Sequence, residues 1–289
     1  ELCWRNMDRV TYRLLHESAW ETLRSLADEH LGGAMLGVTV ILHTWSRAMI
    51  FHPHVHCIIS SGGLSRDRTH WVASRPDFLF SIEEMRDRFR NLFLAKLDRH
   101  HWLRPMYLEG CDGWQKPGEF EQMLSSLSSK TWIAFVQEPF ADVASLTRYL
   151  GQYTHRIAIS DWRIVDMQDS TVEIATRNGE TVVLEGAEFI RRFLLHVPPR
   201  GLSRMRHYGL YSPAGVHLSL DTAWACLEPS KSRPDYDASE PWAVRFERIM
   251  GRHPNLCPHC KKARMVETEQ FPPEKIFDAR FGWRYRNLN

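Results

Sequence analysis

The chain has 289 residues, a hydrophobic content of 43% and a formal net charge of +2. This length suffices for one large domain or two smaller ones. No apolar run reaches 18 residues and no signal-peptide pattern opens the chain, which argues against a membrane-spanning or secreted protein. Six unevenly spaced cysteines argue against a disulfide framework, so we expect a cytoplasmic protein. Because residue 1 is not Met, we expect an N-terminal segment to precede it.

Hydrophobic spacing and turn residues predict the elements in chain order. Apolar residues three and four apart indicate amphipathic helices, and β-branched runs indicate strands. The first half predicts a helix at 8–30, an antiparallel pair of strands at 35–45 and 53–60 with a turn at Ser61-Gly62-Gly63, a helix at 78–99 and a loop at 108–119. The second half predicts a helix at 119–128, a strand at 131–137, a helix at 141–154, short strands at 156–160, 162–167, 171–176 and 181–184, a helix at 187–197 and a linker at 228–241.

The sequence His52-Pro53-His54-Val55-His56 opens the second predicted strand. Side chains alternate along a strand, so His54 and His56 share one face. Neutral imidazole is a common ligand of divalent metal ions, so the pair predicts half of a metal site. His43, on the preceding strand, is our first choice for the third ligand; His52 and Gln152 remain alternatives.

Tyr149 and Tyr153 lie one turn apart on the helix predicted at 141–154. Tyrosines at this spacing usually pack in a core. Two features favour a catalytic role instead: the neighbouring Arg148, His155 and Arg156 are polar or basic, and the same chain carries a candidate metal site. A tyrosine hydroxyl that attacks a DNA phosphate conserves the bond energy in a phosphotyrosine, which permits strand transfer.

Two further groups are candidates for binding. Residues 186–213 carry five arginines against the single acid Glu188, which predicts a phosphate-contacting surface. The arginines assigned to DNA binding are Arg148, Arg156, Arg191, Arg192, Arg204 and Arg206. Cys257 and Cys260 form a C-x-x-C pair that supplies two ligands of a possible Zn²⁺ site, with His253, His259 and Cys226 as candidates for the others. Without metal, both cysteines are reduced thiols.

Three ordered blocks resemble the two-tyrosine HUH transposases of rolling-circle insertion sequences. They are LHTWSRAMIFHPHVHCIISSGGLS (42–65), TRYLGQYTHRIAIS (147–160) and EFIRRFLLHVPPRGLSRMRHYGL (188–210). The resemblance covers about residues 8–212. Relatives carry a cysteine-rich, zinc-binding segment before the nuclease, and this chain lacks it, which puts end recognition and full transposition in doubt.

The resemblance implies an α+β fold, in which helices flank a central antiparallel sheet that carries the metal site. It implies metal binding by His54 and His56, nucleophile roles for Tyr149 and Tyr153, Mg²⁺ or Mn²⁺ as cofactor, and single-stranded DNA at the ends of a bacterial mobile element as substrate. The alternatives are a phosphodiesterase that uses water and a non-catalytic DNA-binding remnant. The expected divisions are an N-terminal helical segment (1–34), the nuclease core (35–160), a β-meander with a basic helix (161–212) and a C-terminal extension (213–289).

Overall fold

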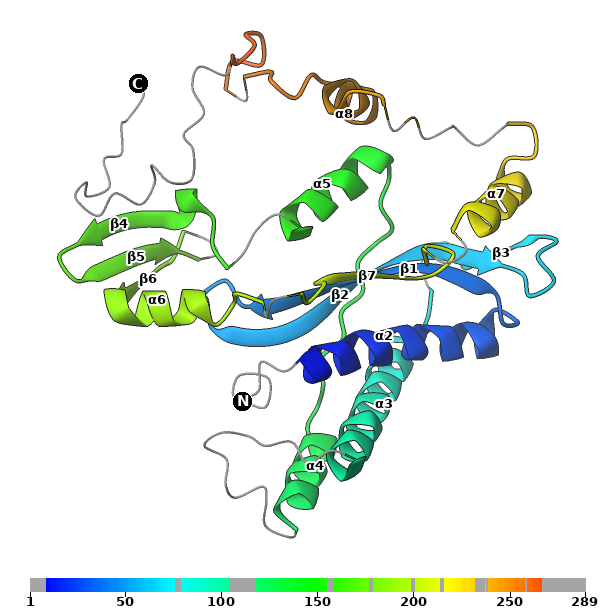
Figure 1. The fold of residues 1–289 in the computed structure, drawn as a ribbon, viewed down its shortest axis with the longest axis horizontal. Coiled ribbons are helices and arrows are strands. Elements are labelled where there is room, and N and C mark those ends of the chain that lie inside the picture. The colour runs from blue at the N-terminus through cyan, green and yellow to red at the C-terminus, as the bar shows by residue number, and fades with distance from the viewer. Residues whose placement is uncertain are drawn as a thin grey trace. The chain divides into compact units, whose positions relative to one another are not determined.

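The computed structural model describes residues 9–75, 79–103, 118–154, 158–176, 179–198, 201–213, 216–231, 237, 239–257 and 259–266. The chain divides into two compact units, Glu1–Asp235 and Tyr236–Asn289. The helices of the larger unit are α2 (Arg9–His30), α3 (Ile82–Leu103), α4 (Glu119–Ser129), α5 (Val143–Thr154), α6 (Gly186–Leu194) and α7 (Val216–Leu227) (Figure 1). Its strands are β1 (Met35–Trp45), β2 (Phe51–Leu64), β3 (Trp71–Ala73), β4 (Ile164–Gln168), β5 (Thr171–Ala175), β6 (Thr181–Glu185) and β7 (Met205–Gly209). The smaller unit contains α8 (Trp242–Met250).

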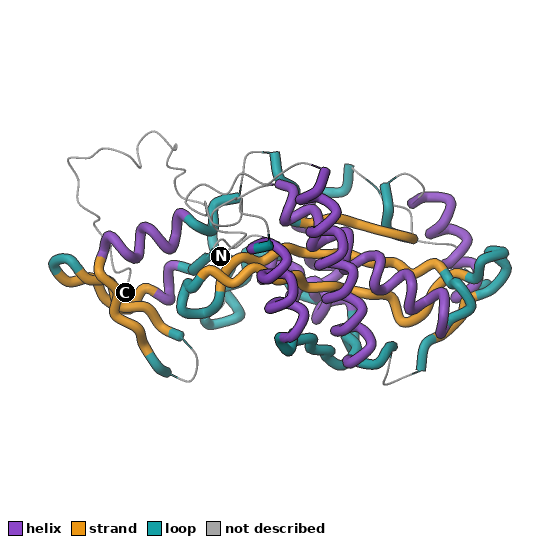
Figure 2. Tube along the Cα trace, turned by 90° about the horizontal axis from the view of Figure 1, so that it is seen from below, coloured by secondary structure: helices purple, strands orange, loops and turns teal. Residues whose placement is uncertain are grey.

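The central sheet of the larger unit has the strand order β3-β2-β1-β7, and each neighbouring pair is antiparallel. The helices α2 and α3 cover one face of this sheet, as the view from below shows (Figure 2). Val38 and Val40 of β1 are fully buried against Leu23 and Leu26 of α2. Because strand side chains alternate, the odd-numbered residues of β1 point to the opposite face.

A second sheet, of order β4-β5-β6, lies beside α6 in the larger unit. Val172, Ile174 and Leu184 form its buried core, to which Met49 also belongs. Met49 lies in the turn between β1 and β2, where its φ is 56°. The second sheet is therefore packed against the hairpin turn of the first.

The structure confirms an α+β fold with an antiparallel sheet flanked by helices, and most predicted elements. The strand at 35–45 has the predicted bounds, whereas the next strand extends to Leu64. The predicted turn at residues 61–63 is therefore wrong. Gly63 lies inside β2, where a Cβ atom would come 2.7 Å from the carbonyl oxygen of Met35. Because Gly63 has no side chain, β2 can lie close to β1 at this point, and the glycine does not mark a turn.

The strand predicted at 131–137 is also wrong. The segment has no regular secondary structure, no described strand pairs with it, and Ile133 and Phe135 are exposed. High β-propensity does not make a strand without a neighbour to accept its hydrogen bonds. The meander has three strands rather than the predicted four, because residues 158–160 are not a strand. Residues 156 and 157 lie outside the described residues, and so does most of the predicted loop at 108–119.

No helix in the described parts of the chain is both long and apolar enough to span a membrane.

Candidate metal centre

The histidines of the candidate site come from the two central strands, β1 and β2. His43 and His54 are directly paired across the strands, and His56 is paired with Ile41. His43, His54 and His56 therefore lie on the sheet face opposite to α2. The pairing places His43 where the sequence predicted it. His52 does not join the group, and the side chain of Gln152 lies outside the described residues.

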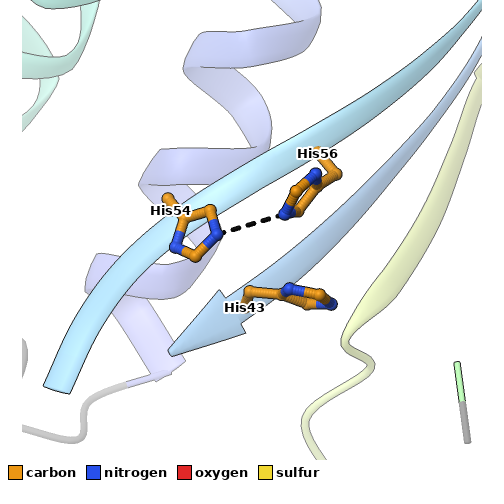
Figure 3. Close-up of side chains that lie close together, drawn as sticks. All are labelled: His43, His54 and His56. Atoms are coloured by element: carbon orange, nitrogen blue, oxygen red, sulfur yellow. Dashed lines mark hydrogen bonds between the residues drawn. The ribbon is translucent and has the colours of Figure 1, made fainter. Parts of the chain in front are cut away.

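The three imidazoles converge closely enough to hold one metal ion. One nitrogen from each of His43, His54 and His56 lies within 4.8 Å of the other two (Figure 3). His43 is buried, whereas His54 and His56 are half-buried. The ring of Trp45 stacks on that of His43, with a centroid separation of 4.7 Å, which holds the imidazole in place.

A chain of hydrogen bonds runs through the cluster and fixes its ring nitrogens. His54 Nδ1–H donates to the His52 carbonyl oxygen at 2.7 Å, so Nε2 of a neutral His54 carries no proton. That nitrogen lies 3.1 Å from His56 Nε2, which therefore donates to it. His56 Nδ1 lies 3.0 Å from the hydroxyl of Tyr149 and accepts its proton in this tautomer. These hydrogen bonds connect the cluster to the tyrosine predicted to be the nucleophile.

Burial favours the neutral form of His54 and His56. It lowers the pKa of His54, and it lowers the pKa of His56 to about 4, with a further decrease from the nearby His54. Desolvation disfavours the charged ring, and a neutral ring is the form that binds a metal. The donor set of three imidazole nitrogens therefore fits a divalent cation.

Tyr149 is placed by α5 and by an aromatic neighbour. The ring of Phe140, just before the helix, meets the ring of Tyr149 edge-on at a centroid distance of 5.2 Å. Tyr153 lies on the same helix one turn later, and its side chain is outside the described residues. The sequence analysis missed Phe140, because nothing in its local pattern distinguishes it from a core residue.

The turn between β1 and β2 is held by residues that the sequence analysis missed or assigned to another role. Three consecutive carbonyl oxygens in this turn accept hydrogen bonds from side chains of later segments. Arg163 donates to the carbonyl of residue 47, Arg192 donates to that of residue 48 at 3.0 Å, and His196 donates to that of residue 49 at 3.2 Å. These bonds fix the turn that joins His43 to the other two histidines.

The predicted DNA-binding arginines lie on several elements. Arg148 is exposed on α5, whereas Arg191 and Arg192 lie on α6 and both pair with Glu188, at 2.6 and 2.7 Å. Their guanidinium groups lower the pKa of Glu188 to about 2. Arg204 precedes β7, and burial lowers its pKa, while Arg206 lies within β7. Arg156 lies outside the described residues. Cys257 and Cys260 belong to the smaller unit.

Comparisons with known proteins agree with the early resemblance. Residues 37–217, which are more than half of the chain, match the family described as "Putative transposase". A protein of Sinorhizobium fredii named "Putative transposase y4qJ" is 34% identical over 91% of this chain and 68% of its own length. The "Transposase for insertion sequence element IS801" of Pseudomonas savastanoi pv. phaseolicola is 22% identical over 82% of this chain and 57% of its own length. No solved structure matches the chain. The match over residues 37–217, which contain the three histidines and Tyr149, means that this chain belongs to the transposase family.

Proposed function

We propose that the chain is the catalytic part of a transposase of the HUH kind, which cleaves and rejoins single-stranded DNA at the ends of a mobile element. The observation that carries this proposal is the 3.0 Å contact between the Tyr149 hydroxyl and His56. It brings a nucleophile of the right type to a cluster that fits a divalent cation. A site that hydrolyses DNA with water would need no tyrosine there.

The cation that best fits the site follows from its donors. Mg²⁺ prefers oxygen ligands, whereas imidazole nitrogen suits transition-type ions. Of the two expected cofactors, Mn²⁺ therefore matches His43, His54 and His56 better than Mg²⁺ does. When bound, the cation would neutralise charge on the non-bridging oxygens of the scissile phosphate and orient that group for in-line attack.

His56 would then act on Tyr149 through its second ring nitrogen. A histidine that serves as a ligand through Nε2 has its proton on Nδ1. His56 Nδ1–H would donate to the Tyr149 oxygen, reversing the direction of the hydrogen bond in the metal-free tautomer. This donor stabilises the developing phenolate, which matters because a tyrosine titrates near pH 10.

The covalent step exchanges one phosphoester for another. The Tyr149 hydroxyl gives up its proton to water and its oxygen forms a bond to phosphorus, while the bond from phosphorus to the 3′ oxygen breaks. The 3′ oxygen takes up a proton from water, which leaves a 3′-hydroxyl. The product is a 5′-phosphotyrosine, which the 3′-hydroxyl of another strand attacks in the reverse sense. Tyr153, one turn further along α5, is proposed as the nucleophile of a second transfer.

An assay with end-labelled DNA tests this proposal. The protein is incubated with Mn²⁺ and a randomised pool of single-stranded oligonucleotides, and is then denatured. We expect a 3′-terminal label to become attached to the protein and a 5′-terminal label to be released on a shorter strand. The adduct disappears in Tyr149→Phe and persists in Tyr211→Phe, because Tyr211 packs beside Leu64 and Leu210 at the other end of β1.

Other outcomes contradict the proposal in distinguishable ways. Cleavage without an adduct indicates a phosphodiesterase that uses water. DNA binding without cleavage indicates a non-catalytic remnant. If His54→Ala cleaves as the unmodified chain does, the histidine cluster is not the catalytic metal site.

A further inference from the structure

The smaller unit contains a pair of metal-type ligands that strand transfer does not use. Cys257 and Cys260 belong to a tight loop closed by a β-bridge between Leu256 and Arg264. The backbone N–H of Cys257 donates to the carbonyl oxygen of Ala263 at 2.8 Å, which draws the two sides of the loop together. Both cysteines are free thiols. The loop is therefore a formed knuckle rather than an irregular tail.

The backbone of this knuckle turns toward the second sulfur. Lys261 has a φ of 56°, in the left-handed region that residues other than glycine rarely adopt. After this turn, the backbone N–H of Ala263 donates to Cys260 Sγ at 3.4 Å. Backbone donors directed at a sulfur stabilise the thiolate, which is the form that binds metal.

The described part of this unit has no buried core to hold the knuckle in shape. None of its described residues from 237 to 266 is buried, and the apolar side chains of Trp242, Val244, Met265 and Val266 are exposed. Small folds with little core are commonly stabilised by disulfides, a structural metal or association. The two free thiols of the knuckle supply ligands for a structural metal in this unit.

The ligands available within the described residues amount to half of a zinc site. A structural zinc ion takes four ligands. Among the described residues, the only group of three or more metal-type side chains is the histidine cluster of the larger unit. Neither His253, whose Nδ1 accepts a hydrogen bond from the backbone N–H of Asn255, nor the exposed His259 joins the two sulfurs in such a group. The knuckle thus contributes two sulfurs and needs two more ligands.

We propose that Cys257 and Cys260 form half of a Zn²⁺ site and that the same two cysteines of a second copy of the chain complete it. Two copies related by a twofold axis present identical knuckles to each other, which gives a tetrahedral set of four thiolates. Soft thiolates select zinc over the harder cations that suit phosphate chemistry. This inference does not depend on the proposed nuclease function.

Cobalt titration of the full chain tests the proposal. The reduced protein is stripped with a chelator and titrated with Co²⁺, because sulfur-to-cobalt charge-transfer absorption distinguishes thiolate ligands from the histidine cluster. We expect one thiolate-bound cobalt per two chains and a doubling of the mass measured by light scattering. Zn²⁺ displaces the cobalt and keeps the dimer, and a chelator restores the monomer.

Paired variants identify the ligands. The double variant Cys257→Ser, Cys260→Ser loses both the sulfur signal and the metal-dependent dimer, whereas Cys226→Ser, on α7 of the larger unit, keeps both. One thiolate-bound cobalt per monomer, loss of the signal in Cys226→Ser, or absence of any sulfur signal would each overturn the proposal. If the double variant does not fold, dissociation of the dimer of the unmodified chain by a chelator still tests whether metal holds the two copies together.

Discussion

The chain holds two groups of metal-type ligands in opposite surroundings. The histidine cluster lies on the central strands of a sheet whose neighbouring side chains Val40 and Leu42 are almost fully buried. The cysteine knuckle lies in a unit with no buried residue among those described. A site supported by a core keeps its geometry without metal, so a bound metal would add chemistry there. A site with no core among the described residues around it would depend on metal to hold its shape, so a bound metal would add stability there.

The largest expected effect is the response of the two units to metal removal. With a chelator, proteolysis within residues 236–289 should accelerate by roughly tenfold or more, because the binding energy of a structural metal is folding energy. In the larger unit, metal removal lowers the free energy of unfolding only by the stabilisation that metal binding supplies. This stabilisation is about 2.7 kcal/mol at a metal concentration one hundred times the dissociation constant. Limited proteolysis with mass spectrometry measures both. Faster cleavage of the larger unit alone would reverse the comparison.

A smaller effect compares how much apolar side chains stabilise each of the two units. Leu42 is fully buried beside His43, so Leu42→Ala should lower the free energy of unfolding of the larger unit by about 2–5 kcal/mol. Val244 on α8 is exposed, so Val244→Ala in the zinc-free chain should stay within about 0.5 kcal/mol. Denaturant titration measures both variants. Equal losses would mean that the smaller unit has a core of its own.

The contrast between the two ligand groups also bears on what the sequence could predict. Alternation along the strands was enough to place His43 opposite His54, because both strands are adjacent in the chain and the hairpin leaves few registers. The helical spacing was likewise enough to put Tyr149 on α5. These parts of the site follow from local periodicity.

The parts that sequence reasoning missed depend on contacts between distant segments. β7 was interpreted as a basic stretch, but it pairs with β1 through Gly209 and Gly37. Arg192, which the sequence analysis assigned to DNA binding, also donates to a carbonyl of the β1–β2 turn, a contact that its local sequence does not indicate. Conversely, residues 131–137 have strand propensity, but none of the described segments pairs with them. Local sequence states which conformations are favourable, and only the tertiary neighbours decide which are used.

The smallest expected effect concerns pH and the histidine cluster. The pKa of His56 is about 4 in the fold, below the ordinary value of 6.5. Between these two values the unfolded chain binds more protons than the folded one, so acid lowers the free energy of unfolding across this window. His54 acts in the same direction, because burial also lowers its pKa. Thermal unfolding of the metal-free protein at a series of pH values measures the effect.

The variant His56→Gln isolates this contribution. It lacks the titrating ring, so its stability should fall less steeply than that of the unmodified chain between pH 6.5 and 4, and the two curves should run parallel above pH 7. His70→Gln, in the exposed turn before β3, leaves His56 in place and should follow the unmodified chain. Parallel curves for all three proteins below pH 6.5 would mean that burial does not hold His56 neutral. The core would then not keep the histidines in the neutral form that binds metal. The claimed difference between the histidine cluster and the cysteine knuckle would lose its support on the side of the cluster.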